Sequence, residues 1–295
     1  MEVATVRTGR PSRTACQNAL FRALEARRPP ADRVADDTLA ADFLSPEYRL
    51  VAELARVPAL RRSTESFIDR RWPCARGGVV ARTRFIDDAV NEELPDVRQV
   101  LILGAGYDSR PYRLPAMRAT DVFEVDHPDT QAFKRRVLAR RGRAGSHNVT
   151  LVPVVFGRDD VGARLTAAGF ATGARTLVLW EGTTNYLDAR AVHDTFTFLA
   201  EAVGPGSPVL FTYVHAGVLD GAVGFEGGPT TMRAVTKAGE PMTFGFDPDA
   251  VPGYLDEHGF DLDWDLAVSE LGQRHYWDDP PSLPAYYHVA KARRR

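Results

Sequence analysis

The sequence of 295 residues contains only two cysteines, Cys16 and Cys74. Two cysteines are too few for a disulfide framework, and we expect both to be reduced thiols in a cytoplasmic protein. The seven histidines are scattered without the spacing of metal ligands, and no cluster of cysteine and histidine accompanies them. The sequence therefore gives no reason to expect a metal ion, and we predict that the protein works without one.

Long hydrophobic runs and an excess of charge of either sign are also absent. No apolar run approaches the ~20 residues that cross a bilayer, and residues 1–12 lack the hydrophobic core of a secretion signal. The formal net charge is only −2, which implies no general attraction to nucleic acid or to anionic membranes. We therefore expect neither a nucleic-acid nor a membrane partner. No feature indicates an oligomeric state.

A glycine turn that follows an apolar run is the strongest local pattern. Val100–Leu103 form an unbroken apolar run, typical of a strand buried on both faces of a parallel sheet. Gly104 and Gly106 follow at once and allow a sharp turn with close approach of a ligand to the backbone. Asp108 and Ser109 then predict the start of a helix. A strand, a glycine turn and a helix start together predict a corner that binds a nucleotide.

Two cofactors remain open at this corner when only the residues are considered. A dinucleotide fingerprint needs a third glycine where this chain has Ser109, which weakens an NAD interpretation without excluding it. Asp126 lies 20 residues after Gly106 at the end of the next apolar run, where an acid accepts hydrogen bonds from ribose hydroxyls. Both NAD and S-adenosylmethionine contain a ribose, so the spacing indicates only an adenosine ligand.

From residue 96 the sequence alternates between short apolar runs and longer segments that fit crossover helices. This alternation predicts an α/β fold with a Rossmann-like, doubly wound and mostly parallel sheet. The predicted strands are 98–103, 121–125, 149–154, 175–180, 207–214, 260–268 and 285–291. The predicted helices in this part are 128–141, 159–168, 188–203 and 247–258. Ligands of such sheets bind at the carboxyl ends of the strands.

Two regions flank or interrupt this alternation. Residues 1–95 precede it, and we expect them to form a helical cap or lid over a core of residues 96–295. The helices predicted in the cap are 14–27, 39–44, 47–57, 60–71 and 77–94. Residues 216–246 contain several glycines and little periodicity, which is typical of a functional loop. We therefore predict a functional loop or lid in this segment.

Four linked motifs resemble one known family. They are Arg82-Thr-Arg-Phe-Ile-Asp-Asp88, Leu103-Gly-Ala-Gly-Tyr-Asp-Ser-Arg-Pro-Tyr-Arg-Leu114, Glu124-Val-Asp-His-Pro128 and Glu181-Gly-Thr-Thr-Asn-Tyr-Leu187. From about Thr14 to the C-terminus the chain resembles the leucine carboxyl methyltransferase-like family of S-adenosylmethionine-dependent O-methyltransferases. Bacterial members of this family include enzymes that methylate polyketides and other secondary metabolites. The resemblance implies S-adenosylmethionine as cofactor and a class I methyltransferase fold, whose seven-stranded sheet has its last strand inserted antiparallel.

The glycine turn and the acid after it are the first candidates for cofactor binding. The resemblance implies that the backbone of Gly104, Ala105 and Gly106 meets the methionine part of the cofactor, although a plain tight turn is the alternative. Asp126 is expected to accept hydrogen bonds from the ribose hydroxyls. Its alternative role is the cap of helix 128–141, and one carboxylate can do both.

Two charged residues are predicted to hold the charged groups of the methionine part. We expect Arg82 to bind the carboxylate, since a guanidinium presents a fork of donors, while Arg84 is the alternative two residues on. Glu181 follows the buried run Leu177–Trp180, where a lone carboxylate is costly without a cationic partner. The ammonium of the cofactor is one such partner, and an arginine of the N-terminal helices is the other.

The adenine end departs from the family pattern. After the third strand, family members commonly carry Asp-Leu, and this chain has Val155 and Phe156. A backbone N–H can still contact adenine N1 there, and Phe156 offers an apolar surface. No side-chain acceptor for the exocyclic amine is present unless Asp159 or Asp160 reaches back.

Tyr186 and His215 are the candidates for a direct part in catalysis. Tyr186 is predicted to line the pocket near the transferred methyl group, with core packing as the alternative. His215 ends the strand 207–214 and is the candidate base, with a structural histidine as the alternative. A carboxylate acceptor is ionised at neutral pH and needs no base, whereas a phenol with a pKa of about 10 needs one. We therefore predict carboxyl O-methylation, with a phenolic O-methyltransferase, an NAD-dependent oxidoreductase and a non-catalytic S-adenosylmethionine sensor as alternatives.

Overall fold

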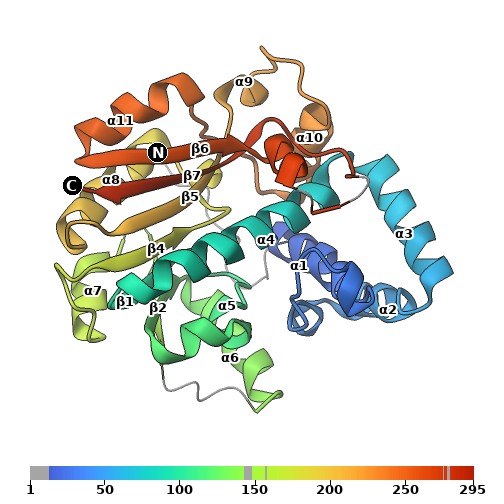
Figure 1. The fold of residues 1–295 in the computed structure, drawn as a ribbon, viewed down its shortest axis with the longest axis horizontal. Coiled ribbons are helices and arrows are strands. Elements are labelled where there is room, and N and C mark those ends of the chain that lie inside the picture. Colours follow the sequence, from blue (N-terminus) through green and yellow to red (C-terminus); the bar gives the residue numbers. More distant parts are fainter. Residues whose placement is uncertain (1–12, 143–147, 157, 275, 278–279) are drawn as a thin grey trace.

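A sheet of seven strands organises the computed structural model, which describes residues 13–142, 148–156, 158–274, 276–277 and 280–295 (Figure 1). The strands lie in the order β3-β2-β1-β4-β5-β7-β6. Their bounds are β1 Gln99–Leu103, β2 Asp121–Asp126, β3 Val149–Pro153, β4 Thr176–Trp180, β5 Pro208–Val214, β6 Phe260–Ala267 and β7 Tyr287–Arg294. The sequence predicted each of these strands, with differences of a few residues at their ends.

The pairing of the strands confirms the predicted α/β class. The pairs formed within β1 to β5 are all parallel. Strand β7 lies between β5 and β6 and is antiparallel to both. Every residue of β1, β4 and β5 is buried. A strand covered on both faces has no solvated side, which explains why these three sequences are apolar almost without interruption. The fold is a mostly parallel, doubly wound sheet with an inserted antiparallel strand.

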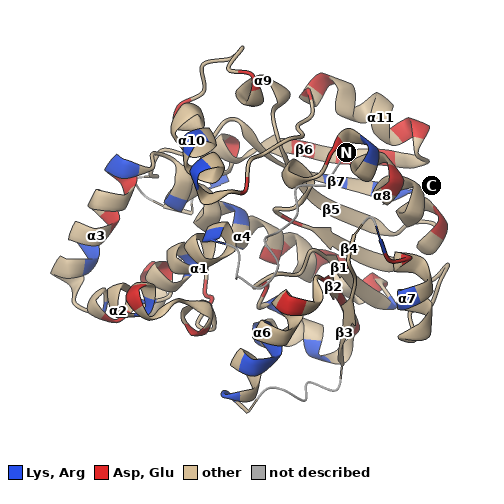
Figure 2. Ribbon diagram, turned by 180° about the vertical axis from the view of Figure 1, so that it is seen from behind, with Lys and Arg blue, Asp and Glu red and all other residues tan. Residues whose placement is uncertain are grey.

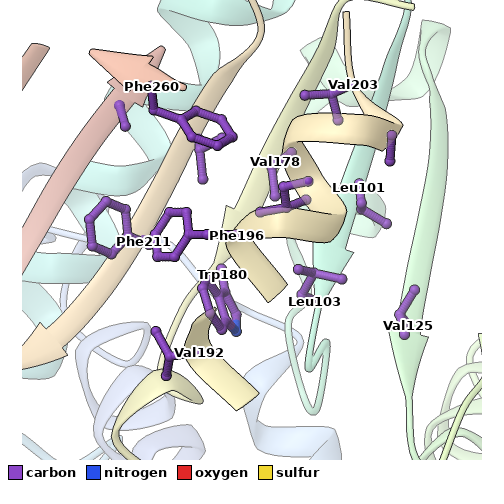
Figure 3. Close-up of a cluster of buried hydrophobic side chains, with 14 of the residues drawn as sticks. Leu101, Leu103, Val125, Val178, Trp180, Val192, Phe196, Val203, Phe211 and Phe260 are labelled. Carbon is purple, nitrogen blue, oxygen red and sulfur yellow. The ribbon is translucent and has the colours of Figure 1, made fainter. Parts of the chain in front are cut away.

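Side chains of β1 alternate between two hydrophobic cores on opposite faces of the sheet. Leu101 and Leu103 belong to the core that includes residues of α7 (Val161–Ala167), α8 (Ala189–Ala202) and α11 (Val251–Glu257). Val100 and Ile102 belong to the core that includes residues of α4 (Ala75–Glu93). Figure 3 shows the first core, in which Phe196 of α8 (Ala189–Ala202) lies with its ring centre 5.4 Å from that of Phe211. Because β1 to β5 run parallel, their carboxyl ends lie at one edge of the sheet.

Crossover helices connect the parallel strands. They are α6 Pro128–Ala139, α7 Val161–Ala167 and α8, and α11 Val251–Glu257 follows the short turn η6 Pro248–Ala250. The carboxylates of Asp160 and Asp188 accept backbone N–H groups in the first turns of α7 and α8. Such caps satisfy donors that have no partner inside the helix, so they fix where each helix begins.

The N-terminal helices lie on one face and at one end of the sheet (Figure 1). They are α1 Arg13–Glu25, α2 Pro46–Leu54, α3 Pro58–Arg71 and α4 Ala75–Glu93, with short turns η1 Pro30–Asp32 and η2 Ala40–Phe43. Helix α4 packs Phe85, Ile86 and Val90 into the same core as β1. The boundary between cap and core at residue 95 stays a prediction, and residues 1–12 lie outside the described part.

Two stretches differ from the expectations. The helix after the glycine turn, α5 Arg110–Arg113, is a single turn followed by η4 Pro115–Ala119, because a residue before proline disfavours helical backbone. The segment 216–246 contains α9 Ala216–Leu219 and an eleven-residue helix, α10 Gly228–Ala238. Proline in the first turn of α10 and Gly239 after its end are ordinary helix signals that the glycine content obscured. Within the described residues, no helix is both long and apolar enough to cross a membrane.

Candidate functional site

Gly104 and Gly106 form the turn at the end of β1, with φ angles of +64° and +40°. A Cβ atom on Gly104 would lie 2.3 Å from Cγ2 of Thr183, in the loop after β4. A Cβ atom on Gly106 would meet nothing closer than the Gly104 carbonyl oxygen at 3.8 Å. Ala105 fixes the turn by donating its N–H to the Val125 carbonyl at 3.1 Å. Gly104 therefore lets two loops pack together, and Gly106 leaves space beside the backbone.

Asp126, at the end of β2, faces this turn. Its Oδ2 accepts the N–H of Gly106 at 2.5 Å, and its Oδ1 accepts the N–H of His127 at 2.6 Å. Burial raises the pKa of Asp126 above its usual value, although both backbone donors oppose this. A carboxylate has about four acceptor positions and these two donors use two of them, so it is held in place with capacity to accept from ribose hydroxyls.

Glu181, directly after β4, is held by two arginines. Its Oε1 accepts from Nε of Arg82 at 2.7 Å, and its Oε2 accepts from Nη1 of Arg110 at 2.7 Å. Burial alone would raise the pKa of Glu181, but the two guanidinium groups outweigh it and hold the pKa at about 2. The ion pair that the sequence left as an alternative is therefore formed, and the contact with a cofactor ammonium stays a prediction.

Arg110 extends this contact into a buried ionic network. Its Nε donates to Asp87 of α4 at 2.7 Å, and its Nη1 also contacts Asp108 at 2.8 Å. Arg113 contacts the same Asp87 at 2.6 Å. The side chain of Arg110 is only 4% exposed. Charges so far from water persist because each has a partner at hydrogen-bond distance.

The cap contributes one more ion pair to the network. Arg22 of α1 donates to Asp37 at 2.8 Å and to the carbonyl of Tyr107 at 3.1 Å. Burial opposes ionisation of Asp37, but Arg22 and Arg113 outweigh it and lower its pKa. Helix α1 is thereby tied to the residue that follows the glycine turn.

Arg82 keeps free donors, whereas Arg84 does not face the site. Arg82 is 6% exposed and uses Nε for Glu181, and its guanidinium carbon lies 4.7 Å from the ring centre of Tyr287. Within the described residues, neither Nη atom of Arg82 donates to a protein acceptor. Arg84 is exposed and pairs with Asp88 four residues on, at 2.9 Å. Of the two, Arg82 is the one that can offer two parallel donors to a ligand carboxylate.

Tyr186 lies in η5 (Thr184–Tyr186) under the first turn of α1. Burial raises the pKa of its hydroxyl, and the neighbouring side chain of Thr14 opposes this. Glu240, just after α10, accepts the backbone N–H groups of Arg13 and Thr14 at 3.1 Å each. The cap, the 216–246 segment and the loop after β4 therefore meet at Tyr186. Its position near a methyl group stays a prediction.

His215 caps α9. Its Nδ1 accepts the N–H of Gly217 at 3.0 Å, and its ring centre lies 5.1 Å from that of Phe225. A backbone N–H can only donate, so Nδ1 carries the lone pair and neutral His215 carries its proton on Nε2. In this arrangement the imidazole presents a donor, and Nδ1 is not available to take a proton from a substrate. The geometry matches the structural alternative for His215.

The strand end near the expected adenine site is partly closed by an acid. Phe156 follows β3 and is 38% exposed. The Val155 N–H donates to Oδ2 of Asp159 at 2.9 Å, so this backbone donor is not open to adenine N1. Asp160 instead caps α7. Of the two acids, Asp159 is the one that reaches back to the strand end.

Arg110, Asp87 and Arg113 are the site residues that sequence reasoning did not assign. Asp87 lies in the motif of residues 82–88, and Arg110 and Arg113 lie in the motif of residues 103–114. Charged residues of opposite sign in two linked motifs are a signal that could have indicated a buried ion pair. Thr183 was also missed, and its hydroxyl is buried without a hydrogen-bond partner in the described chain. An orphaned hydroxyl beside Gly104 is consistent with a site that a polar ligand completes.

The sequence of this chain is similar to those of known proteins. The family model described as leucine carboxyl methyltransferase matches residues 15–200. SCO7813 of Streptomyces coelicolor, named among S-adenosyl-L-methionine-dependent methyltransferases, is 32% identical over 262 residues, covering 88% of this chain and 85% of the relative. A relative from Mycolicibacterium gilvum with the same kind of name is 37% identical over 187 residues, covering 63% of this chain and 53% of the relative. The chain thus matches about half the length of that second relative.

Solved structures share the fold. A DUF574 family protein from Streptomyces avermitilis has a TM-score of 0.60 and 13% identity, covering 96% of this chain and 100% of that chain. A Thermobifida fusca protein described as a methyltransferase has a TM-score of 0.56 and 14% identity, covering 92% of this chain and 97% of that chain. At such low identity the likeness shows the fold alone.

The Gly104→Ala substitution should destabilise the protein in two ways. The added Cβ atom would clash with Thr183, and alanine would be strained at the positive φ angle of this position. Gly142→Ala is the matched control, since Gly142 has a φ of +66° but a Cβ atom there would meet no described heavy atom within 4 Å. A positive φ costs a non-glycine residue about 1–2 kcal/mol, and overpacking against Thr183 should add about 1–3 kcal/mol. Urea unfolding measures both. Equal losses for the two variants would contradict the close packing of the two loops.

The Glu181→Gln substitution should lower the free energy of unfolding by about 3 kcal/mol at pH 7, because it leaves buried guanidinium groups without their partner. The folded pKa of about 2 lies below the ordinary value of 4.5. The stabilisation is therefore complete above about pH 4.5 and is lost as the pH falls towards 2. Urea unfolding between pH 7 and 3 should show the gap between wild type and variant closing.

Glu92→Gln provides the control for this prediction. Glu92 is an exposed acid on the same helix as Arg82. Its substitution should change stability by less than about 0.5 kcal/mol. A similar loss for Glu92→Gln and Glu181→Gln, or a gap that does not depend on pH, would show that Glu181 is not the stabilising partner.

Proposed function

Since the chain belongs to the leucine carboxyl methyltransferase family of S-adenosylmethionine-dependent methyltransferases, we propose that it methylates a carboxylate of a small molecule or peptide, in secondary metabolism. The observation that carries the proposal is the pairing of Glu181 with an Arg82 whose Nη atoms remain free in the described chain. An acid beside an open guanidinium matches the ammonium and carboxylate of the methionine part of the cofactor.

The residues of the corner fit S-adenosylmethionine in three places. Arg82 would bind the carboxylate, Glu181 the ammonium, and Asp126 the ribose hydroxyls. The open space beside Gly106 would admit the ligand against the backbone. The exposed ring of Phe156 would cover adenine.

The chemistry of this cofactor asks little of the protein beyond position. The bound sulfonium supplies an activated methyl group, and the acceptor displaces the sulfur in line. A carboxylate is already ionised at neutral pH, so no side chain has to remove a proton. The roles left to this chain are to orient the acceptor beneath Tyr186 and to exclude water through the cap.

The geometry supports carboxylate over phenol as acceptor. A phenol needs a base, and Nδ1 of His215 is occupied by a backbone N–H. The geometry at Ser109 does not support NAD as the cofactor. The residue is 2% exposed, and its hydroxyl accepts a hydrogen bond from Nε of Arg113 at 3.0 Å. A pyrophosphate therefore has no access to that hydroxyl.

Arg82→Lys should weaken binding of S-adenosylhomocysteine, because an ammonium cannot reproduce the two parallel donors of a guanidinium. Loss of a buried charged contact costs about 2–5 kcal/mol. Calorimetry should give the dissociation constant, and the rise in melting temperature with the ligand gives a second readout. S-adenosylhomocysteine should stabilise the wild type, and NAD should not.

Arg84→Lys is the matched control on the same helix. It should bind S-adenosylhomocysteine as the wild type does, because Arg84 is exposed and pairs with Asp88. Loss of binding in Arg84→Lys but not in Arg82→Lys would assign the carboxylate contact to Arg84 instead of Arg82. Normal binding in both variants would remove the proposed carboxylate contact.

The pH dependence of turnover should separate the two acceptor chemistries. A carboxylate acceptor should give activity that is flat from about pH 6 upward, and His215→Gln should keep most of kcat at saturating cofactor. A phenol activated by histidine should give activity that rises through neutral pH, with a loss of about 10²–10⁴-fold in His215→Gln. Mass spectrometry of the product distinguishes ester from ether. A large loss with normal cofactor binding would overturn the carboxylate assignment.

A further inference from the structure

A buried ion pair lies behind the acid that ends β2. Glu124 and Asp126 are two residues apart on this strand, so their side chains point to the same face of the sheet. The side chain of Glu124 is completely buried, and its Oε2 lies 2.7 Å from Nζ of Lys134 in α6, whose side chain is 1% exposed. Two opposite charges are therefore withdrawn from water beside the acid that faces the glycine turn.

Helix α6 is also fixed on the sheet by a neutral side chain. Gln131, one turn before Lys134, donates from Nε2 to the carbonyl oxygens of Glu124 at 2.8 Å and of Val152 at 3.1 Å. Figure 2 shows α6 next to β3, with basic residues along it. The docking of α6 thus has an anchor that does not need the charge of Lys134.

Stability alone does not account for a charged pair at this position. Apolar residues of similar size usually stabilise a core as well as a buried ion pair does, or better. The neighbouring residues of β2 follow this rule, since Val122, Phe123 and Val125 lie in the hydrophobic cores. The pair is therefore an electrostatic feature that packing does not require.

Lys134 acts electrostatically on Asp126 as well as on Glu124. Burial raises the pKa of Glu124 to about 7, and Lys134 opposes this rise. Burial also raises the pKa of Asp126 above its usual value. The N–H groups of Gly106 and His127 oppose that rise, and so does the ammonium of Lys134. One cation thus faces two neighbouring carboxylates and favours the ionised form of both.

The charge of Asp126 decides what it can bind. An ionised carboxylate only accepts hydrogen bonds, whereas a protonated one carries a donor on one of its oxygens. The N–H groups of Gly106 and His127 already occupy one position on each oxygen. Two ribose hydroxyls that donate to the remaining positions need both oxygens to be free of a proton, and their hydrogen bonds are stronger to a charged acceptor.

We propose that Lys134 is a positioning residue for the cofactor: it keeps the ribose-binding carboxylate of Asp126 ionised, and Glu124 holds its ammonium in place behind β2. This inference rests on the proposed contact of Asp126 with the ribose, and it is independent of the acceptor that is methylated. Lys134 acts through Asp126 and touches no reacting atom. Loss of its charge should weaken ribose binding only where the pH is low enough for Asp126 to take up a proton.

Four variants test this role. Lys134→Met removes the cation and Glu124→Gln removes the buried acid, so each breaks the ion pair. The double variant removes both charges and should fold, because a buried pair can be replaced by neutral residues of similar size. Arg135→Met is the control, since Arg135 is an exposed cation at the next position of α6.

The measurement is the dissociation constant of S-adenosylhomocysteine and of its 2′,3′-dideoxy analogue, by calorimetry between pH 5 and pH 8. The ratio of the two constants reports the ribose contact. In the wild type it should be about tenfold or more, as for a hydrogen bond to a charged group.

The pH at which this ratio falls is the decisive readout. It should lie higher by about one unit or more in Lys134→Met and in the double variant, because loss of a nearby cation raises the pKa of a carboxylate. At pH 8 both variants should bind S-adenosylhomocysteine as the wild type does. Glu124→Gln and Arg135→Met should show no upward move.

Other titratable groups near Asp126 are common to all variants and contribute equally to each pH profile. They stand after the glycine turn, in α5, at the start of α6, and around Tyr107 on the side of α1 and α10. These groups are Tyr107, Asp108, Tyr112, His127, Asp129, Cys16, Arg22 and Glu240.

The outcomes separate an electrostatic role from a structural one. An upward move only in the two variants that lack Lys134 supports the inference. Equal moves in Lys134→Met and Glu124→Gln overturn it, because the broken pair would then matter and not the lost cation. A loss of binding that persists at pH 8, or an unchanged profile in the double variant, overturns it as well.

Failure of the proposed cofactor contact gives a different result. Equal dissociation constants for S-adenosylhomocysteine and its dideoxy analogue in the wild type would remove the ribose contact of Asp126, and this inference with it. Carboxyl methylation would remain to be judged by turnover. If the wild type prefers S-adenosylhomocysteine and the variants lacking Lys134 do so with the same pH profile, the ribose contact stands and only the role of Lys134 is wrong.

Discussion

The structure of the candidate site depends on one buried interaction, the contact of Glu181 with Arg82 and Arg110. These residues come from the end of β4, from α4 and from α5, and Arg82 and Glu181 are 99 residues apart in the sequence. A carboxylate withdrawn from water is costly unless cations face it, so the three elements are constrained to meet here. The contact thus fixes helix α4 against the edge of the sheet where we propose that the cofactor binds.

This interaction also prepares the site before any ligand arrives. Arg82 is oriented by Nε, which bonds Glu181, and its Nη atoms stay free of described protein acceptors on the same rigid group. Asp126 is oriented in a similar way by two backbone N–H groups. Groups that are already held lose little further freedom when they bind, so more of each contact with the ligand appears as affinity. The Arg82 side chain therefore has two compatible roles: its Nε pairs with Glu181, and its Nη atoms are open to the proposed ligand contact.

The sequence predicted the sheet well because burial on both faces leaves an unbroken apolar run, as in β1 and β4. It missed α10 because glycine-rich flanks hid a helix of ordinary composition. The family resemblance pointed to Arg82 and Glu181 as candidates, but Arg110 went unassigned because its partners Asp87 and Glu181 lie 23 and 71 residues away. The tautomer of His215 depends on a backbone donor, which no residue pattern specifies.

The charge of the corner is consistent with the carboxylate acceptor that we propose. Four arginines of the network face four carboxylates, namely Arg22, Arg82, Arg110 and Arg113 against Asp37, Asp87, Asp108 and Glu181. Asp126 adds one negative charge, with no cation in direct contact among the described residues. S-adenosylmethionine carries one net positive charge, which Asp126 can balance. When a carboxylate takes the methyl group, its own charge and that of the sulfonium disappear together. The corner then keeps the same total charge before and after transfer, and no buried group has to change its protonation.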